Sequence, residues 1–132
     1  NLFNDIENIK LNANFNNIEN LTVFADKEKL MRVFNNLIKN AIQSIEDDQQ
    51  GVINIDISTD KKNVLIKISD NGKGIDDDMK LKLFEPNFTT KTGGMGLGLS
   101  IVKNIVNDIN GSIWFNSELG KGTTFYVKLQ LG

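Results

Sequence analysis

The chain has 132 residues, 39% of them hydrophobic and 24% charged, with a formal net charge of −2. This length suits one domain with its own core, and the weak negative charge disfavours nucleic acid and acidic membranes as partners. Cysteine and histidine are both absent, which excludes disulfides, thiolate metal sites and the commonest general base. No apolar run is long enough to span a bilayer. Any chemistry must therefore use carboxylates, amides, lysines, backbone groups or a bound ion.

The first 46 residues predict a polar leading segment, a strand and a long helix. Residues 1–20 contain eight asparagines, and we interpret them as the end of a helix from an upstream region. Because residue 1 is not methionine, we expect a fragment or a processed product. The domain is expected to span residues 21–132, and its first apolar run, residues 21–25, suits a strand. Asp26 is a plausible N-cap for a helix over residues 27–46 with an apolar face.

The middle of the chain predicts a hairpin and a short helix. Residues 53–57 and 64–68 alternate apolar and polar side chains, which indicates two strands joined through residues 60–63. Three aspartates at residues 76–78 suit the N-terminus of a short helix.

The last third of the chain predicts a loop, a helix and a second hairpin. Residues 85–98 are rich in glycine and threonine and are expected to form the loop. Apolar residues at helical spacing over residues 99–109 predict a helix that ends at Asn110 and the following glycine. Residues 112–117 and 123–131 indicate two strands. The mixed order favours an α+β fold, a two-layer sandwich of one sheet and a few helices.

Asn36 and Asn40 are the first candidate site residues. They are four residues apart in the long helix, so their amides lie on the same side. An amide oxygen can ligate a hard cation such as Mg²⁺, which prefers oxygen ligands and phosphates. The alternative is two surface asparagines on an Asn-rich helix, and the spacing alone leaves both open.

Asp70 begins the second candidate segment, Asp-Asn-Gly-Lys-Gly, directly after a predicted strand. Gly72 and Gly74 would let the backbone come close to a flat ligand. A buried carboxylate could accept a hydrogen bond from an exocyclic amine. The alternative is an ordinary Asn-Gly turn.

Three further segments could contact a ligand. Residues 93–98 hold four glycines and lead into a helix, so their amides suit a phosphate, although a flexible linker is the alternative. Their spacing matches neither a Walker loop nor a dinucleotide fingerprint. Residues 84–91 combine aromatic residues, two threonines and a lysine, which suits a lid or an ordinary loop. Residues 120–124 are expected to form a turn with at most one hydroxyl facing a ligand.

Taken together, these segments resemble the catalytic, ATP-binding domain of bacterial sensor histidine kinases, a branch of the GHKL superfamily. Five segments match its motifs in order: the N box (36–41), the first glycine box (70–75), the F box (83–91), the second glycine box (94–98) and the closing glycine box (120–125). The resemblance covers residues 21–131. It implies a Bergerat-type fold, in which about three helices cover one face of a mixed, mostly antiparallel sheet.

The resemblance also implies a role for each matching residue. Asn40 would ligate Mg²⁺ with support from Asn36, and Lys91 would hold phosphates, so these three are the expected catalytic residues. Asp70 would accept the adenine amine, and Thr123 would join the adenine site through its hydroxyl or a water. The other expected contacts with ATP are Gly72, Gly74, Ile75, Phe84, Thr90, Gly94, Gly96, Leu97 and Gly98.

The implied activity is that of a protein-histidine kinase in two-component signalling. The domain would transfer the γ-phosphoryl group of ATP to a histidine on a separate dimerisation domain of the parent protein, with a response regulator downstream in the phosphorelay. Related ATPases carry a glutamate as general base where this chain has Asn36, which fits transfer better than hydrolysis. Gln43 occupies the position at which many relatives have a lysine.

Two alternatives remain open. One is a nucleotide-binding regulatory module of the same fold without phosphotransfer, and the other is a GHKL ATPase or serine kinase. In each case we expect a monomeric domain in the cytoplasm, without direct membrane contact, whose parent protein can be membrane-anchored.

Overall fold

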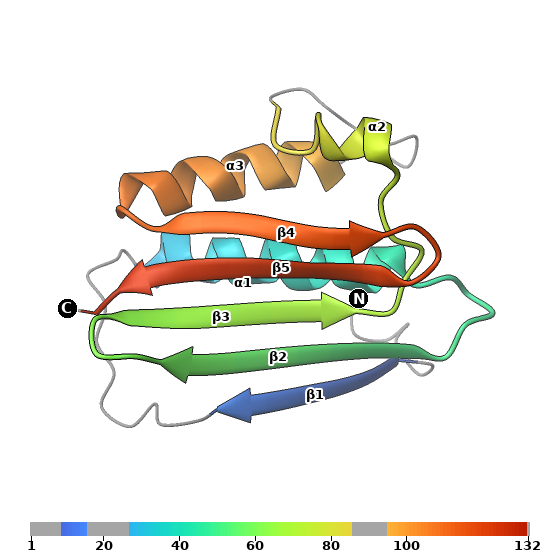
Figure 1. Cartoon of the computed structure of the whole chain (residues 1–132), viewed down its shortest axis with the longest axis horizontal. Coiled ribbons are helices and arrows are strands. Elements are labelled where there is room, and N and C mark those ends of the chain that lie inside the picture. Colours follow the sequence, from blue (N-terminus) through green and yellow to red (C-terminus); the bar gives the residue numbers. More distant parts are fainter. Residues whose placement is uncertain (1–8, 16–26, 86–94, 132) are drawn as a thin grey trace.

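The computed structural model describes residues 9–15, 27–85 and 95–131. Within these ranges five strands form one sheet and three segments are helical (Figure 1). In chain order the elements are β1 (Ile9–Phe15), α1 (Lys27–Ser44), β2 (Gly51–Thr59), β3 (Asn63–Asp70), α2 (Asp77–Lys80), α3 (Met95–Asp108), β4 (Ser112–Glu118) and β5 (Gly122–Gln130). None of the described helices is long and apolar enough to cross a membrane.

The sheet is mixed and mostly antiparallel, as the sequence predicts. Its strand order is β1-β2-β3-β5-β4. β1 runs parallel to β2, whereas the other three pairs are antiparallel. The hairpins β2–β3 and β4–β5 confirm the two predicted pairs of strands, and β5 inserts between β3 and β4.

The core lies between one face of the sheet and the helices α1 and α3. Helix α1 contacts α3 and the strands β2, β3 and β5, while α3 also contacts β4. The side chains with no exposed surface come from both layers: Val33, Leu37, Leu99, Val102, Val106 and Val127. Burial of this apolar surface stabilises the fold by roughly 25 cal/mol for each Å² removed from water. The expected two-layer α+β sandwich is therefore confirmed.

Strand β1 departs from the sequence prediction. Residues 9–15 fall in the leading segment that we interpret as the end of a helix, and that local structure is wrong. Apolar residues occupy every second position from Ile9 to Phe15, and this period of two matches a strand. The strand pairs in register with β2, from Ile9 opposite Gly51 to Phe15 opposite Ile57. The predicted strand over residues 21–25 and the Asp26 cap lie outside the described residues.

Helix α3 begins earlier than the sequence predicts. Residues 95–98 are helical, so the expected loop over residues 85–98 is wrong at its end. Glycine costs only about 1 kcal/mol in a helix interior, which the packing of one apolar face offsets. At the other end Asn110 has a φ of 59° and the Gly111 N–H donates to the Val106 carbonyl oxygen at 2.9 Å. This left-handed cap confirms the predicted helix end.

Five segments meet at one end of the molecule (Figure 1). The last turn of α1, the end of β3, α2, the first turn of α3 and the turn between β4 and β5 all lie there. The other ends of α1, β3 and α3 lie at the opposite edge, so the fold gathers the candidate site segments in one place.

Truncation of Leu37 tests the predicted packing of α1 on the sheet. Leu37→Ala removes a side chain with no exposed surface, so we expect the free energy of unfolding to fall by about 2–5 kcal/mol. Met31→Ala on the same helix is the control, because Met31 is 50% exposed and should lose less than about 0.5 kcal/mol. Urea denaturation followed by circular dichroism measures both, and equal losses would contradict the packing.

Candidate functional site

A small cavity of about 20 Å³ lies beside the end of β3, where α1 and β5 meet it. Its volume is close to that of one water molecule. The residues that line it come from α1, β3, α2, β5 and the connecting loops: Asn40, Ser44, Asp70, Lys73, Gly74, Ile75, Met79, Leu83, Thr123 and Phe125. Five of them, Asn40, Asp70, Gly74, Ile75 and Thr123, are residues that the sequence predicts for the site.

Asp70 is the last residue of β3 and is held between two strands. It lies opposite Ile53 of β2 and Thr123 of β5. Burial raises the pKa of its carboxyl group above the ordinary value of 3.8, against the opposing effect of nearby donors. The Gly72 N–H donates to its Oδ1 at 2.9 Å. The Ser44 hydroxyl also faces the carboxylate, but it donates to the Ala41 carbonyl oxygen at 2.8 Å, so the backbone N–H groups of Gly72 and Thr123 are the donors that we assign to Asp70.

The two glycines after Asp70 serve different purposes. A Cβ atom at Gly72 would lie 2.1 Å from the Ser44 Oγ and 2.6 Å from the Ser44 carbonyl oxygen, so only glycine fits against the end of α1. Gly74 has a φ of 74°, and a Cβ there would lie 2.3 Å from the Glu118 carbonyl oxygen. Both glycines therefore allow close approach of one backbone to another around the cavity.

Asn71 fixes the loop to the start of β2. Its side-chain Nδ2 donates to the Gln50 carbonyl oxygen at 3.0 Å, and its Oδ1 accepts from the Val52 N–H at 2.8 Å. The next residue anchors the loop to α1, because the Lys73 N–H donates to the Ser44 carbonyl oxygen at 3.0 Å. Positive φ angles occur at neither Asn71 nor the following glycine. The Asn-Gly pair therefore does not form a turn with left-handed backbone, such as a type I′ turn.

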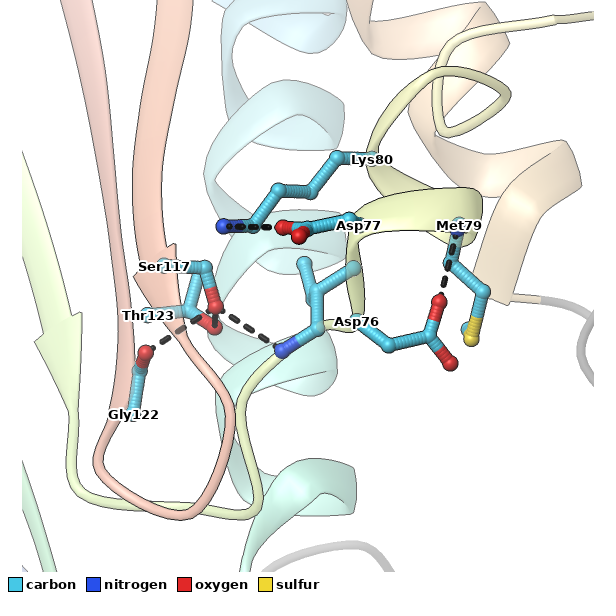
Figure 2. Close-up of polar contacts among 8 residues, drawn as sticks. Asp76, Asp77, Met79, Lys80, Ser117, Gly122 and Thr123 are labelled. Atoms are coloured by element: carbon cyan, nitrogen blue, oxygen red, sulfur yellow. Dashed lines mark hydrogen bonds and ion pairs between the residues drawn. The ribbon is translucent and has the colours of Figure 1, made fainter.

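Ser117 and Thr123 lie side by side on β4 and β5 (Figure 2). Their hydroxyl oxygens are 2.8 Å apart. The Ser117 hydroxyl also donates to the Gly122 carbonyl oxygen at 3.0 Å and accepts from the Ile75 N–H at 2.9 Å. Ser117 thus connects the β4–β5 hairpin to the segment that closes the cavity. Thr123 itself is 5% exposed.

Helix α2 closes the cavity on its outer side. The Asp76 carboxylate caps the helix by accepting from the Met79 N–H at 2.8 Å (Figure 2). An exposed ion pair joins Lys80 Nζ to Asp77 Oδ1 at 3.3 Å. Met79 and the fully buried Leu83 line the cavity from this side.

Asn40 is buried, but Asn36 is not part of the cavity lining. Asn40 is 5% exposed, and its Nδ2 has no hydrogen-bond partner among the described residues. An unpaired buried polar group costs about 1–3 kcal/mol, so a ligand that pairs with this amide would gain from it. Asn36 lies one turn earlier on α1 and is partly exposed. The spacing of four residues therefore puts both amides on one side, but only Asn40 reaches the cavity.

The remaining predicted residues fall into two groups. Phe84 does not line the cavity: its ring packs edge-on against Phe115 at 5.7 Å, and Lys103 Nζ lies 5.1 Å from its centroid. Thr90, Lys91 and Gly94 lie outside the described residues. Gly96, Leu97 and Gly98 lie in the first turn of α3. The N–H groups of Gly96 and Leu97 have no acceptor within the helix, because the first turn has none to offer.

Sequence reasoning missed several residues that line the cavity. Ser44 could have been found, because it continues the four-residue spacing from Asn36 and Asn40 on the same side of α1. The alternation of apolar and polar residues along its strand predicts a core position for Phe125, but it does not predict contact with a ligand. Lys73, Met79 and Leu83 have no signal of their own, because their positions depend on how the loop and α2 fold back over β5.

Comparison with known proteins gives consistent matches. Residues 25–132 match the family model described as histidine kinase-, DNA gyrase B- and HSP90-like ATPase. The sensor histidine kinase ZraS of Escherichia coli K12 is 46% identical over 105 residues, which are 80% of this chain and 22% of ZraS. The nucleotide-free catalytic domain of histidine kinase ThkA superposes with a TM-score of 0.81 at 33% identity, covering 93% of this chain and 80% of that domain. Full-length ShkA in complex with AMPPNP gives a TM-score of 0.79 at 26% identity, with 94% of this chain and 26% of ShkA covered.

The raised pKa of Asp70 makes a prediction about stability and pH. A carboxyl group whose pKa is higher in the folded chain stabilises the fold fully below its unfolded pKa, near 3.8. That stability is lost as the pH rises through the folded pKa. Asp70→Asn should therefore increase the free energy of unfolding at pH 7, and the increase should shrink as the pH falls toward 4.

Chemical denaturation of both proteins at several pH values measures this difference. Asp48→Asn, at an exposed position in the loop after α1, is the matched control and should change stability little at either pH. A difference between the Asp70→Asn variant and the parent chain that does not depend on pH would contradict the assignment.

Proposed function

Because the chain belongs to the family of histidine kinase-, DNA gyrase B- and HSP90-like ATPases, we propose that it binds Mg-ATP and transfers the γ-phosphoryl group to a histidine on a separate dimerisation domain. The half-buried Asp70 carboxylate, in one cavity with Asn40 and Thr123, is the observation that carries the proposal. The chain spans about a fifth of the length of the kinase ZraS and contains no histidine. The acceptor domain and the downstream response regulator are therefore part of the proposal.

The adenine ring would bind at the Asp70 end of the site. An ionised carboxylate only accepts hydrogen bonds, so it suits the exocyclic amine of adenine. Gly72 and Gly74 let the loop backbone pack against Ser44 and Glu118, which would keep Asp70 next to the Thr123 hydroxyl. The cavity of about 20 Å³ is smaller than a purine, so the ring would need more space than the cavity has in this structure.

The phosphates would bind toward Asn40 and the start of α3. The N–H groups of Gly96 and Leu97, which have no acceptor within the described helix, and the positive end of the helix dipole suit a negatively charged group. Lys91, Thr90 and Gly94 precede this turn in the sequence and would complete the phosphate contacts. The described residues contain no cluster of three or more carboxylates that could hold a metal. The amide oxygen of Asn40 together with phosphate oxygens suits Mg²⁺, which usually takes one or two protein ligands beside phosphates.

Transfer to another acceptor fits the site better than hydrolysis does. Bound Mg²⁺ would neutralise charge on the β- and γ-phosphates. A hydrolase also needs a general base beside the attacking water, and Asn36 cannot serve as one. Asp70 is the only carboxylate among the described residues that line the cavity, and its place is at the adenine end. The chain would therefore position ATP and leave the nucleophile to its partner domain.

Calorimetric titration with Mg-ATP tests the binding site. Asp70→Asn replaces one carboxylate oxygen with an NH₂ group, which cannot accept a hydrogen bond from the adenine amine. It also removes the negative charge that strengthens that bond, so ATP affinity should fall by about 10- to 100-fold. Affinity of the parent chain should also fall as the pH drops toward the raised pKa of Asp70, because protonation removes the acceptor. Asp48→Asn should bind like the parent. Equal affinity of the parent and the Asp70→Asn variant would contradict the adenine site.

Incubation with Mg-ATP and the histidine-bearing dimerisation domain of a similar kinase tests the transfer. We expect a phosphorylated partner whose phosphate is labile in acid and stable in base, as a phosphohistidine is. An acid-stable product would indicate a serine kinase, and tight ATP binding without transfer would indicate a regulatory module. Rapid ATP hydrolysis by the chain alone would also contradict the proposal.

A further inference from the structure

The Ser117 hydroxyl makes three contacts within hydrogen-bond distance. It lies 2.9 Å from the Ile75 backbone nitrogen, 3.0 Å from the Gly122 carbonyl oxygen and 2.8 Å from the Thr123 Oγ1. Figure 2 shows Ser117 beside Thr123 of the neighbouring strand, with dashed lines from its hydroxyl to Thr123 and Gly122. The three partners of the Ser117 hydroxyl are an N–H donor, a carbonyl acceptor and a second hydroxyl. Together they restrict the positions of the two hydroxyl protons.

We assign the direction of the bond between Ser117 and Thr123 by the arrangement of protons that pairs all three contacts. A hydroxyl group carries one proton and two acceptor lone pairs. The Gly122 carbonyl oxygen has no proton, so the Ser117 proton lies in that bond. The Ile75 N–H occupies one lone pair of Ser117. In the remaining contact Ser117 is therefore the acceptor, and the Thr123 hydroxyl donates to it.

The direction of this bond determines what the Thr123 hydroxyl can offer to a ligand in the cavity. Thr123 lines the cavity and is 5% exposed, so its only hydroxyl proton is already used when a ligand approaches. Its Oγ1 can then only accept. Asp70, directly opposite Thr123 in the sheet register, also only accepts when it is ionised. Two acceptors thus stand next to each other at the place where the base would bind.

We propose that Ser117 is a positioning residue that selects the base: by taking the Thr123 proton, it makes Thr123 an acceptor that favours a 6-aminopurine over a 6-oxopurine. This inference rests on the proposed binding of ATP at Asp70. A 6-oxo group would place a third acceptor against the two in the site, whereas a 6-amino group supplies a donor to them, so the site favours the amine. Without Ser117, the Thr123 hydroxyl can turn and donate to the 6-oxo group.

The hydrogen bond itself can be tested without any nucleotide. In isotope-labelled protein, a buried hydroxyl proton that is held in a bond exchanges slowly with water and gives an NMR signal. We expect such a signal for Thr123 in the parent chain, with a nuclear Overhauser contact to the Ser117 Hβ protons. It should disappear in Ser117→Ala and persist in Ser112→Ala, a matched change at the other end of β4. A Thr123 proton that exchanges at the same fast rate in the parent and in Ser117→Ala overturns the inference.

The selection of the base is tested by the ratio of ATP to ITP affinity, because ITP carries a 6-oxo group in place of the amine. We expect the parent chain to prefer ATP and Ser117→Ala to lower this preference about fivefold, the effect of one neutral hydrogen bond. Ser117→Thr keeps a hydroxyl on the strand and should retain the parent ratio, as should Ser112→Ala. In a Thr123→Val background, Ser117→Ala should change the ratio no further, because the proton in question is gone.

The outcomes separate the inference from the proposed function. Equal losses of ATP and ITP affinity in Ser117→Ala would show a role in holding the backbone and nothing more, which overturns the inference. A parent chain that binds ATP through Asp70 but does not prefer it over ITP overturns the inference and leaves the proposed function standing. A parent chain that does not bind ATP overturns both. If Ser117→Ala does not fold, Ser117→Thr and Thr123→Val still decide, since only the second should lower the ratio.

Discussion

The arrangement of this domain depends on one carboxylate that is kept at the buried end of a central strand. Asp70 ends β3 with a strand on either side, and burial raises its pKa. An ionised carboxylate in such a place costs free energy unless donors compensate for the lost water. The chain supplies donors locally, through the Gly72 N–H, and fixes the loop that carries them to α1, β2 and the β4–β5 hairpin. Much of the polar structure at this end of the molecule can be understood as support for that one group.

This cost in stability indicates a function. Carboxylates with raised pKa values in a concave site are more common at binding and catalytic positions than elsewhere. The Asn40 Nδ2 in the same cavity has no hydrogen-bond partner among the described residues, so it is a second polar group that a ligand can pair with. The Asp70 carboxylate accepts hydrogen bonds, whereas the Asn40 amide nitrogen can donate one. A ligand with an amine at one end and anionic oxygens at the other would satisfy both, and ATP is such a molecule.

The sequence predicted the sheet, the helices α1 and α2, and five of the residues around the cavity, because each depends on a local pattern. Two such patterns are the alternation of apolar and polar residues in β2, β3 and β5 and the apolar face of α1. It failed at β1, where the number of asparagines hides the alternation from Ile9 to Phe15, and at the start of α3, where glycines indicate a loop. It also could not place Phe84, whose contacts with Phe115 and Lys103 depend on tertiary packing. Met79 and Leu83 were missed for the same reason.

The central claim is that the ionised carboxylate of Asp70 accepts the adenine amine. The most direct measurement is an NMR titration of the Asp70 side-chain carboxyl carbon, in the free chain and with saturating Mg-ATP. Donors from a ligand favour the ionised form, and binding and ionisation are linked. We therefore expect a pKa above the ordinary value of 3.8 in the free chain and a clear fall when ATP binds. A pKa that is the same with and without bound ATP would contradict it.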